Sequence, residues 1–331
     1  MRVVSLLPSA TEIVGALGAT PLLVGRSHEC DHPADVASLP VLTSQRTAGA
    51  EPGEIDRPEP GEIDRQVREA LDRGESLYRL DEETLRRLSP DVILTQDLCD
   101  VCTIDLATVR RVAAGLSPPP LVVSLDPDSV EAVLDDVLTV GRAVGFDDAA
   151  RRLVVELRAR LFSAAERVNP YDDGPSVAFL EWTDPLFVGG HWTPQLIERA
   201  GARHPLNPTR SAPDAGAAAG PQQAFAKAGK SRQVTPDELV RSAPDAIIIC
   251  PCGMNLEQAS ECAHELAREP WWPELPAVRT GRIAIVDGSQ MFNRPGPRLV
   301  DAFEWLVGWL NDRANLIPPG FPWEPLARPT P

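Results

Sequence analysis

Six cysteines and five histidines carry most of the metal-binding chemistry that this 331-residue sequence offers. Four of the cysteines form two close pairs, one with the Cys-x-x-Cys spacing that lets two thiolates bind one soft metal ion, and one with a single proline between them. A His-x-Cys pair nearer the N-terminus could complete the ligand shell. We therefore predict six metal-facing residues: His28, Cys30, Cys99, Cys102, Cys250 and Cys252.

Other roles for these side chains remain open. Free cysteines are often inert and buried, so a purely structural thiol cluster is the main alternative to a metal site. A redox dithiol is less favoured, because Asp97 and Asp100 would raise the pKa of the thiols beside them. Cys30 could also act as a nucleophile with His28 or His191 as its base, although spacing alone gives no geometry for such a pair.

Polar and aromatic side chains accompany the cysteines. Asp97, Glu181 and His191 are the candidates for acid and base roles. The predicted ligand contacts are Pro8, Ser9, Thr11, Gln96, Trp182, Trp192, Asn293 and Arg294. The aromatic members could lie against a flat ligand, but core packing is the commoner use of tryptophan. Cys262 is expected to pack inside a helix, and His204 and His264 to be exposed.

Most of the candidate residues follow directly after short apolar runs that predict β-strands. The predicted strands are residues 3–6, 22–25, 92–95 and 121–124 in the first half, and 177–181, 246–250 and 283–286 in the second. Amphipathic stretches between them predict helices, the first opened by a capping box at Ser9 to Glu12 and later ones capped by Asp81 and Asp105. Ligands of α/β proteins bind where parallel strands end, so we expect these residues to converge.

The alternation of strands and helices predicts an α/β protein with two Rossmann-like lobes, each with a mostly parallel sheet, joined by a long backbone helix. The predicted lobes are residues 1–126 and 171–331, and the connecting helix is 127–170, which Gly145 could interrupt. Residues 46–66 are expected to be an irregular insertion, because Glu51–Arg57 recurs as Glu59–Arg65. Residues 204–233 are expected to form a flexible insertion.

Charge and hydropathy exclude some partners. The 48 acidic and 32 basic residues give a net charge of −16, which repels nucleic acid and anionic lipid. No stretch approaches the roughly 20 apolar residues of a membrane span. The opening residues, Met1 to Pro8, resemble a strand and do not resemble an export signal. We therefore predict a cytoplasmic protein. The oligomeric state is not predicted.

Four segments carry a resemblance to a known family. Residues 2–12, the strand at 22–25, Ser89–Leu94 and Ala243–Ile248 together resemble the periplasmic-binding-protein class that captures cobalamin and iron chelates. The resemblance implies two lobes on a backbone helix, with the ligand in the cleft between the lobes. The Ser-His-Glu-Cys-Asp, Cys-x-x-Cys and Pro-Cys-Gly elements are similar to an intracellular branch that is often labelled cobalamin-binding.

The leading hypothesis is an intracellular carrier or sensor for a corrinoid or another metal chelate. The alternative is a metalloenzyme whose thiolates hold an iron–sulfur, zinc or copper centre. A third hypothesis is an interaction module without a small ligand, which predicts no bound metal.

Overall fold

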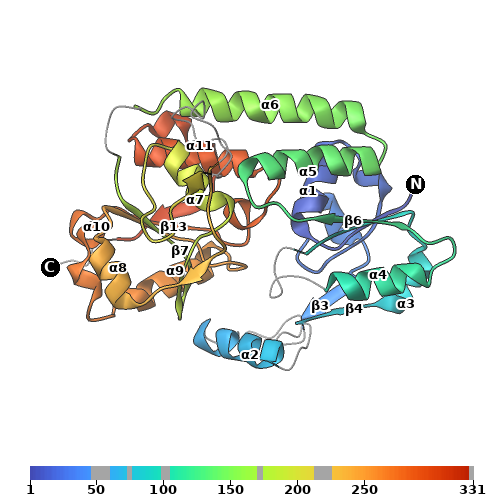
Figure 1. The fold of residues 1–331 in the computed structure, drawn as a ribbon, viewed down its shortest axis with the longest axis horizontal. Helices are drawn as coiled ribbons and strands as arrows, with labels where there is room; N and C mark the ends of the chain where they lie inside the picture. The colour runs from blue at the N-terminus through green and yellow to red at the C-terminus, as the bar shows by residue number, and fades with distance from the viewer. Residues whose placement is uncertain (46–59, 73–76, 98–104, 170–173, 212–225, 328–331) are drawn as a thin grey trace. The chain divides into compact units, whose positions relative to one another are not determined.

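The computed structural model describes residues 1–45, 60–72, 77–97, 105–169, 174–211 and 226–327, and therefore does not include Cys99 and Cys102. The chain divides into two compact units (Figure 1). Unit 1 comprises Met1–Pro127 and Ala132–Leu157, and unit 2 comprises Asp128–Glu131 and Arg158–Pro331.

Unit 1 contains a four-stranded parallel sheet in the order β2-β1-β5-β6. Its strands are β1 (Val3–Ser5), β2 (Leu23–Arg26), β5 (Val92–Gln96) and β6 (Leu121–Leu125). All four were predicted from their apolar, β-branched runs. A small antiparallel pair, β3 (Thr43–Gln45) and β4 (Tyr78–Leu80), lies outside this sheet. Because the four main strands are parallel, the segments that follow them leave from one edge of the sheet.

Helices α1 (Pro8–Ala16), α3 (Glu82–Leu88) and α4 (Leu106–Ala114) connect the strands of unit 1. The predicted caps are confirmed at Asp81, whose carboxylate accepts from Thr84 N, and at Asp105, which accepts from Ala107 N and Thr108 N. The capping box expected at Ser9 is wrong. Helix α1 already begins at Pro8, which suits a first helical position because its missing N–H would have no partner there.

The helical stretch predicted between the lobes forms two helices, α5 (Val130–Ala143) and α6 (Asp147–Ala165). Gly145, with φ of 77°, interrupts them, as the sequence suggested. Phe146 N then donates to Gly141 O to close the turn. Helix α6 runs unbroken for 19 residues.

The described part of the second copy of the tandem repeat, residues 60–65, is helical, which corrects the expectation of an irregular segment over residues 60–66. Helix α2 (Pro60–Asp72) begins with a proline, and Arg65 pairs with Glu62 and Glu69 at distances of 2.6 and 2.9 Å. Ion pairs at these spacings support helix formation in a strongly charged segment. The first copy, at residues 51–57, lies outside the described residues.

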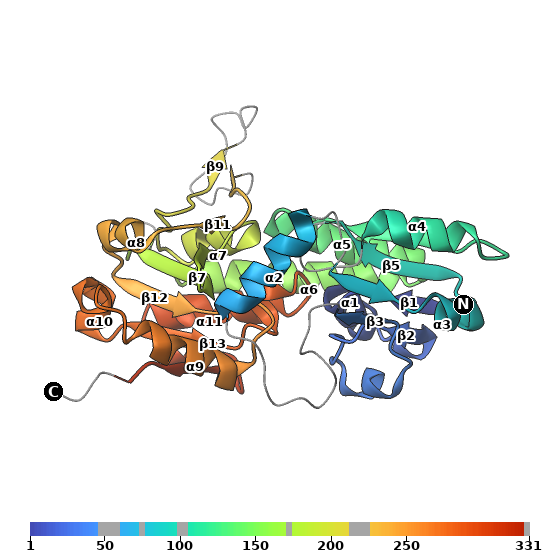
Figure 2. The same ribbon diagram turned by 90° about the horizontal axis from the view of Figure 1, so that it is seen from below.

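Unit 2 contains a six-stranded sheet in the order β11-β8-β7-β12-β13-β14. Its parallel centre is β7 (Val177–Thr183), β12 (Ala246–Ile249) and β13 (Ile283–Val286), which were predicted. The antiparallel strands β8 (Leu186–Val188), β11 (Arg232–Gln233) and β14 (Trp323–Pro325) extend both sides of it. A two-stranded pair, β9 (Arg210–Ser211) and β10 (Ala226–Lys227), projects from the unit in Figure 2.

Helices cover both faces of the unit 2 sheet. A buried apolar cluster joins one face to α8 (Pro236–Ser242), α9 (Leu256–Leu266) and α10 (Pro276–Thr280). Helices α7 (Trp192–Arg199) and α11 (Leu299–Leu310) lie on the other side in Figure 1. There Trp305 is fully buried between the stacked rings of Trp309 and Phe321, whose centroids lie 5.4 and 5.3 Å away.

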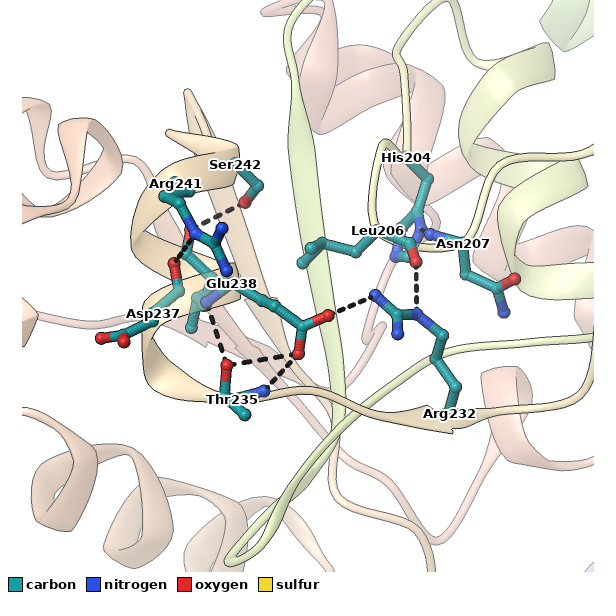
Figure 3. Close-up of polar contacts among 10 residues, drawn as sticks. His204, Leu206, Asn207, Arg232, Thr235, Asp237, Glu238, Arg241 and Ser242 are labelled. Atoms are coloured by element: carbon teal, nitrogen blue, oxygen red, sulfur yellow. Dashed lines mark hydrogen bonds and ion pairs between the residues drawn. The ribbon is translucent and has the colours of Figure 1, made fainter.

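The described parts of the 204–233 segment are anchored, where a flexible excursion was expected. Figure 3 shows Arg232 donating to Leu206 O at 2.7 Å and to the Glu238 carboxylate at 3.1 Å, while Glu238 closes a capping box with Thr235. His204 was expected to be exposed, and this is wrong: it is 1% exposed. No described helix is both long and apolar enough to span a bilayer.

Candidate functional site

The turns that leave the unit 1 sheet bring two predicted site residues together. Thr11, at the start of α1, places its hydroxyl 3.0 Å from Cys30 Sγ and 2.8 Å from Ser5 Oγ. Cys30 Sγ lies 3.5 Å from Ser27 Oγ, and the cysteine is 1% exposed. The thiol is therefore held in a buried network of hydroxyl groups. Of the other two predicted residues here, Ser9 is buried and Pro8 is half-buried.

A neighbouring part of the same turn holds His28. Its Nδ1 lies 2.7 Å from the Thr43 hydroxyl, and its ring lies 5.5 Å from that of Tyr78. Burial, followed by the positive charge of Arg26, lowers the pKa of His28 to about 4. Its Nε2 is buried and has no hydrogen-bond partner among the residues that the structure describes. The imidazole is therefore neutral at pH 7 and can offer a lone pair to a metal or a donor group.

The ends of β5 and β6 are acidic. Asp97 N donates to the Asp126 carboxylate at 2.5 Å, and Ser124 donates to the same carboxylate. Burial, with repulsion from Asp126 and Asp135, raises the pKa of Asp136 on α5 to about 7. The predicted contact Gln96 is half-buried at the end of β5.

The sequence itself adds to this negative charge. In the sequence, the segments that follow the unit 1 strands, residues 27–33, 97–105 and 126–127, contain six acidic residues and no lysine or arginine. Arg26 precedes them, and it donates to the carbonyl oxygens of Ser27, Cys30 and Ala37. The described part of this edge therefore carries the acidic side chains of Glu29, Asp97 and Asp126.

In unit 2, Glu181 and His191 lie near one short segment, residues 229–231. Ser231 donates to the Glu181 carboxylate, with its Oγ 2.9 Å from both oxygens. His191 N donates to Gly229 O at 2.9 Å. A side chain at Gly190 would lie 2.2 Å from Ser231 N, so this close approach requires glycine.

His191 adopts a backbone conformation that L-residues rarely occupy, with φ of 53° and ψ of −115°. Burial, followed by the charge of Lys230, lowers the pKa of its half-buried ring, while Asp128 opposes the shift. Asn207 supports this region, because its amide donates to Gly189 O and to Lys230 O, both at 3.1 Å. The surrounding chain therefore fixes a neutral imidazole in a strained loop.

The cysteine pair of unit 2 is divided between two environments. Cys250 is fully buried, and burial raises the pKa of its thiol well above the usual value. Asn293 Nδ2 lies 3.7 Å from its sulfur and also donates to Gly288 O. Cys252 is half-buried and donates its backbone N–H to Glu181 O at 3.0 Å. Cys250 is thus a packed, protonated thiol, whereas Cys252 is accessible.

The remaining predicted contacts have mainly structural partners. Trp192 is 7% exposed and donates to Phe292 O at 2.7 Å. Trp182 donates to Asp184 O, and Arg294 is 7% exposed. Cys262 is buried in α9 against Met254, as expected. Within the described ranges, no group of three or more His, Cys, Asp or Glu side chains is placed to hold a metal ion.

Sequence reasoning missed four residues that support these sites. Asp126 follows β6 directly, so the rule that located the other candidates could have found it. Ser27 and Thr43 pair with predicted residues, and Ser231 lies in a segment that was given no role. Thr43 and Ser231 are distant along the chain from their partners, and the sequence carries no signal for such pairs, whereas Ser27 lies only three residues before Cys30.

Comparison with known proteins agrees with this fold. A family model described as periplasmic binding protein matches residues 3–289. No curated protein is similar enough to count as a match.

Three solved structures illustrate the similarity. The periplasmic heme-binding protein RhuT from Roseiflexus sp. RS-1, in its apo form, is 23% identical with a TM-score of 0.65, covering 95% of this chain and 98% of that one. A periplasmic heme-binding protein from Pseudomonas aeruginosa is 20% identical with a TM-score of 0.65, covering 98% and 95%. The periplasmic vitamin B12 binding protein BtuF of Vibrio cholerae is 17% identical with a TM-score of 0.62, covering 95% and 97%. At these identities the likeness establishes the fold alone.

Proposed function

Because this chain belongs to the periplasmic binding protein family, we propose that it binds a metal chelate and performs no chemistry on it. The observation that carries the proposal is the family match over residues 3–289, together with the ligands named for structures of the same fold, which are heme and vitamin B12. Both ligands are flat macrocycles with a central metal. We infer that a ligand of this class contacts the carboxyl edges of the sheets, where α/β proteins bind ligands.

We further propose that the ligand is a corrinoid and not heme. Heme carries two carboxylate groups, whereas the periphery of a corrinoid carries uncharged amides. The acidic residues that follow the unit 1 strands, among them Glu29, Asp97 and Asp126, would repel carboxylates. The pKa of Asp136 is raised to about 7 chiefly by burial, and the negative charges of Asp126 and Asp135 add to the shift. Amide groups could instead donate to these carboxylates.

His28 and His191 are the proposed metal-facing residues of the two units. Both have lowered pKa values, so each presents a neutral imidazole at pH 7, the form that ligates metals. Cys252 is the proposed thiol contact of unit 2, because it is accessible where Cys250 is sealed. Cys99 and Cys102 remain predicted contacts.

Ligand titration tests the proposal. Purified protein is titrated with dicyanocobinamide, cyanocobalamin and hemin, and binding is followed by calorimetry and visible absorbance. We expect the corrinoids to bind at least roughly tenfold more tightly than hemin, a difference of about 1.4 kcal/mol. Tighter hemin binding would contradict the corrinoid assignment and leave chelate binding intact. If none of the three binds, the proposal of chelate binding fails.

Single variants separate the proposed contacts from general effects. His28→Gln and His191→Gln should each change the visible spectrum of the bound corrinoid and weaken its binding, whereas the exposed His264→Gln should change neither. Unchanged spectra in both His28→Gln and His191→Gln would show that neither histidine contacts the metal. The metalloenzyme alternative makes a different prediction, since protein purified without added chelate would then contain stoichiometric iron, zinc or copper by elemental analysis.

A further inference from the structure

A pocket of about 670 Å³ lies at the amino ends of two parallel strands of unit 2. Ser176, which directly precedes β7, and Asp245, which directly precedes β12, both line it. The rest of its wall comes from the second half of α7, the segment 202–209 and the end of α8, all within unit 2. The proposed chelate contacts the carboxyl ends of the strands, so this pocket is a separate site at the opposite edge of the sheet.

Hydrogen bonds hold the segment after α7 in place as one wall of the pocket. Arg203 continues the sheet beyond β7, because its N–H donates to Pro175 O at 2.9 Å and its carbonyl accepts from Val177 N at 2.8 Å. Thr209 donates to the Glu198 carboxylate on α7, from its N–H at 2.9 Å and also from its hydroxyl. The pocket is therefore formed by the fold of unit 2 before any ligand binds.

Two arginines of the wall have hydrogen-bond donors that the described residues do not use. Arg203 is exposed, and its side chain donates from Nε to Gly174 O at 3.2 Å. The side chain of Arg199 is 16% exposed, and its Nη2 pairs with Glu131 at 2.7 Å. The other N–H groups of both guanidiniums have no partner within the described ranges. Guanidinium groups with free N–H donors bind carboxylates well, often through two parallel hydrogen bonds.

Asp245 brings a negative charge to the same pocket. It is exposed, and its Oδ2 accepts a hydrogen bond from Ser176 N at 2.8 Å, which leaves Oδ1 without a partner among the described residues. Glu198, the other acidic residue of the wall, already accepts two hydrogen bonds from Thr209. The pocket therefore offers both guanidinium donors and a carboxylate oxygen to a ligand that carries both charges.

The Ser176 hydroxyl is a further unpaired group beside the pocket. Ser176 is 8% exposed, and its Oγ has no hydrogen-bond partner among the residues that the structure describes. Buried polar atoms are nearly always paired, so a water or a polar group of a ligand is the expected partner. The deep part of the pocket is therefore suited to a polar occupant.

We propose that this pocket binds a short peptide with free termini, whose carboxylate pairs with Arg199 and Arg203 and whose ammonium group pairs with Asp245. Such a ligand carries one charge of each sign, so the net charge of −16 on the chain does not repel it as a whole. At about 30 Å³ for each water, the pocket has room for roughly 20 waters, close to the number of non-hydrogen atoms in a tripeptide. Ala202 and Pro208 add apolar surface for small side chains.

Binding of trialanine to the purified chain tests the proposal, by calorimetry and saturation-transfer NMR up to about 10 mM peptide. We expect a dissociation constant of about 0.1–1 mM. N-acetyl-trialanine and trialanine amide each lack one charge, and each should bind roughly tenfold more weakly because one charged side of the pocket stays unpaired. Free alanine keeps both charges but fills little of the pocket, and it should also bind roughly tenfold more weakly.

Single variants locate the peptide on the chain. Arg203→Gln and Asp245→Asn should each weaken trialanine binding roughly tenfold, and the asparagine keeps an oxygen that can accept from Ser176 N. Arg268→Gln changes an exposed arginine of unit 2 outside the pocket, and as the matched control it should leave binding unchanged. Cys252→Ser, beyond the opposite end of β12, should also leave binding unchanged, which separates the pocket from the proposed chelate site.

Absence of trialanine binding up to about 10 mM would overturn the proposal. Equal binding of the acetylated or amidated peptide would overturn it too, because the pocket would then not recognise both charges, and equal binding of alanine would overturn the assignment to a peptide. Equal weakening by Arg268→Gln, or loss of binding in Cys252→Ser, would place the peptide elsewhere on the chain. Circular dichroism of each variant checks that its fold is retained.

Discussion

His204 illustrates what burial does to a single titratable side chain. The ring is 1% exposed, and the backbone N–H groups of Phe179 and Asn207 lie 3.4 and 3.2 Å from its two nitrogens. Burial is the largest cause that lowers the pKa of this imidazole from 6.5 to about 4. The folded chain therefore keeps the ring neutral in a range where the unfolded chain binds a proton.

This difference predicts a loss of stability in weak acid. Between pH 6.5 and 4 the unfolded state binds a proton at His204 that the folded state refuses, so the free energy of unfolding falls by up to about 3 kcal/mol over that range. Urea unfolding at pH 7.5, 6 and 5 measures the effect. His204→Gln should be less stable at pH 7.5 and show a shallower pH dependence, and the remaining slope includes His28, whose pKa is also about 4.

The exposed His264→Gln is the matched control, and it should keep the pH dependence of the original chain. An identical slope in His204→Gln would show that this ring does not cause the loss.

Sequence reasoning located residues well when the strand pattern placed them. Thr11 and Cys30 were both predicted after strand ends, and their side chains lie 3.0 Å apart. It could not distinguish Cys250 from Cys252, since the position after a strand does not say which of two neighbouring side chains turns into the core. The prediction that His204 is exposed failed for a related reason. A polar segment rich in alanine and glycine gives no sign that one of its side chains is buried.

At the scale of elements, Arg160 joins α11 to the part of α6 that belongs to unit 2. From α6 it reaches Asp301 at 2.5 Å and Glu304 at 2.6 Å, both on α11. About a third of the arginine side chain is exposed, at 36%, and the two acids are more buried, at 24% and 22%. Two partly buried carboxylates therefore depend on one guanidinium.

Removing the Arg160 guanidinium should lower the free energy of unfolding more than removing an exposed guanidinium does. Arg160→Ala should lower the free energy of unfolding by about 1–2 kcal/mol, less than for a fully buried pair because solvent screens part of the interaction. Arg152→Ala, an exposed change on the same helix, should alter it by less than about 0.5 kcal/mol. Urea unfolding compares the two. Adding Asp301→Asn and Glu304→Gln to Arg160→Ala should recover part of the loss, and no recovery would contradict this account.

Elements were predicted best where local chemistry decides them. The strands of the parallel sheet of unit 1 and of the parallel centre of the unit 2 sheet followed from apolar runs, and the helix caps at Asp81 and Asp105 followed from capping residues. Helix α2 was not predicted, because the prolines and glycines of the repeat are typical of an irregular segment. Its ion pairs at helical spacing nevertheless favour a helix. The antiparallel strands at the sides of the unit 2 sheet are short and depend on pairing across the fold, which no local pattern reveals.

At the scale of the molecule, charge repulsion is the main feature. With a net charge of −16, the folded chain holds like charges closer together than the unfolded chain does. Raising sodium chloride from about 20 to 200 mM shortens the Debye length from roughly 20 Å to below 10 Å and should raise the melting temperature by several degrees. Surface ion pairs weaken under the same conditions, so a falling melting temperature would mean that attraction outweighs repulsion. Differential scanning calorimetry decides between the two.

The family and the two-lobed α/β fold followed from the sequence because strand, helix and turn patterns recur along nearly the whole chain. The cytoplasmic location and the cysteine ligands stay predictions. They depend on cellular context and on residues 98–104, and neither is fixed by the packing of the described residues.

All seven tryptophans belong to unit 2, and Trp305, Trp309 and Phe321 form the ring stack in its core. Unit 1 has none, so its fluorescence comes from tyrosine alone. Fluorescence excited at 295 nm therefore reports on unit 2 and not on unit 1. Thermal unfolding can be followed by this fluorescence and, separately, by far-ultraviolet circular dichroism. Comparing the two curves would show, without any label, whether the two units lose their structure together.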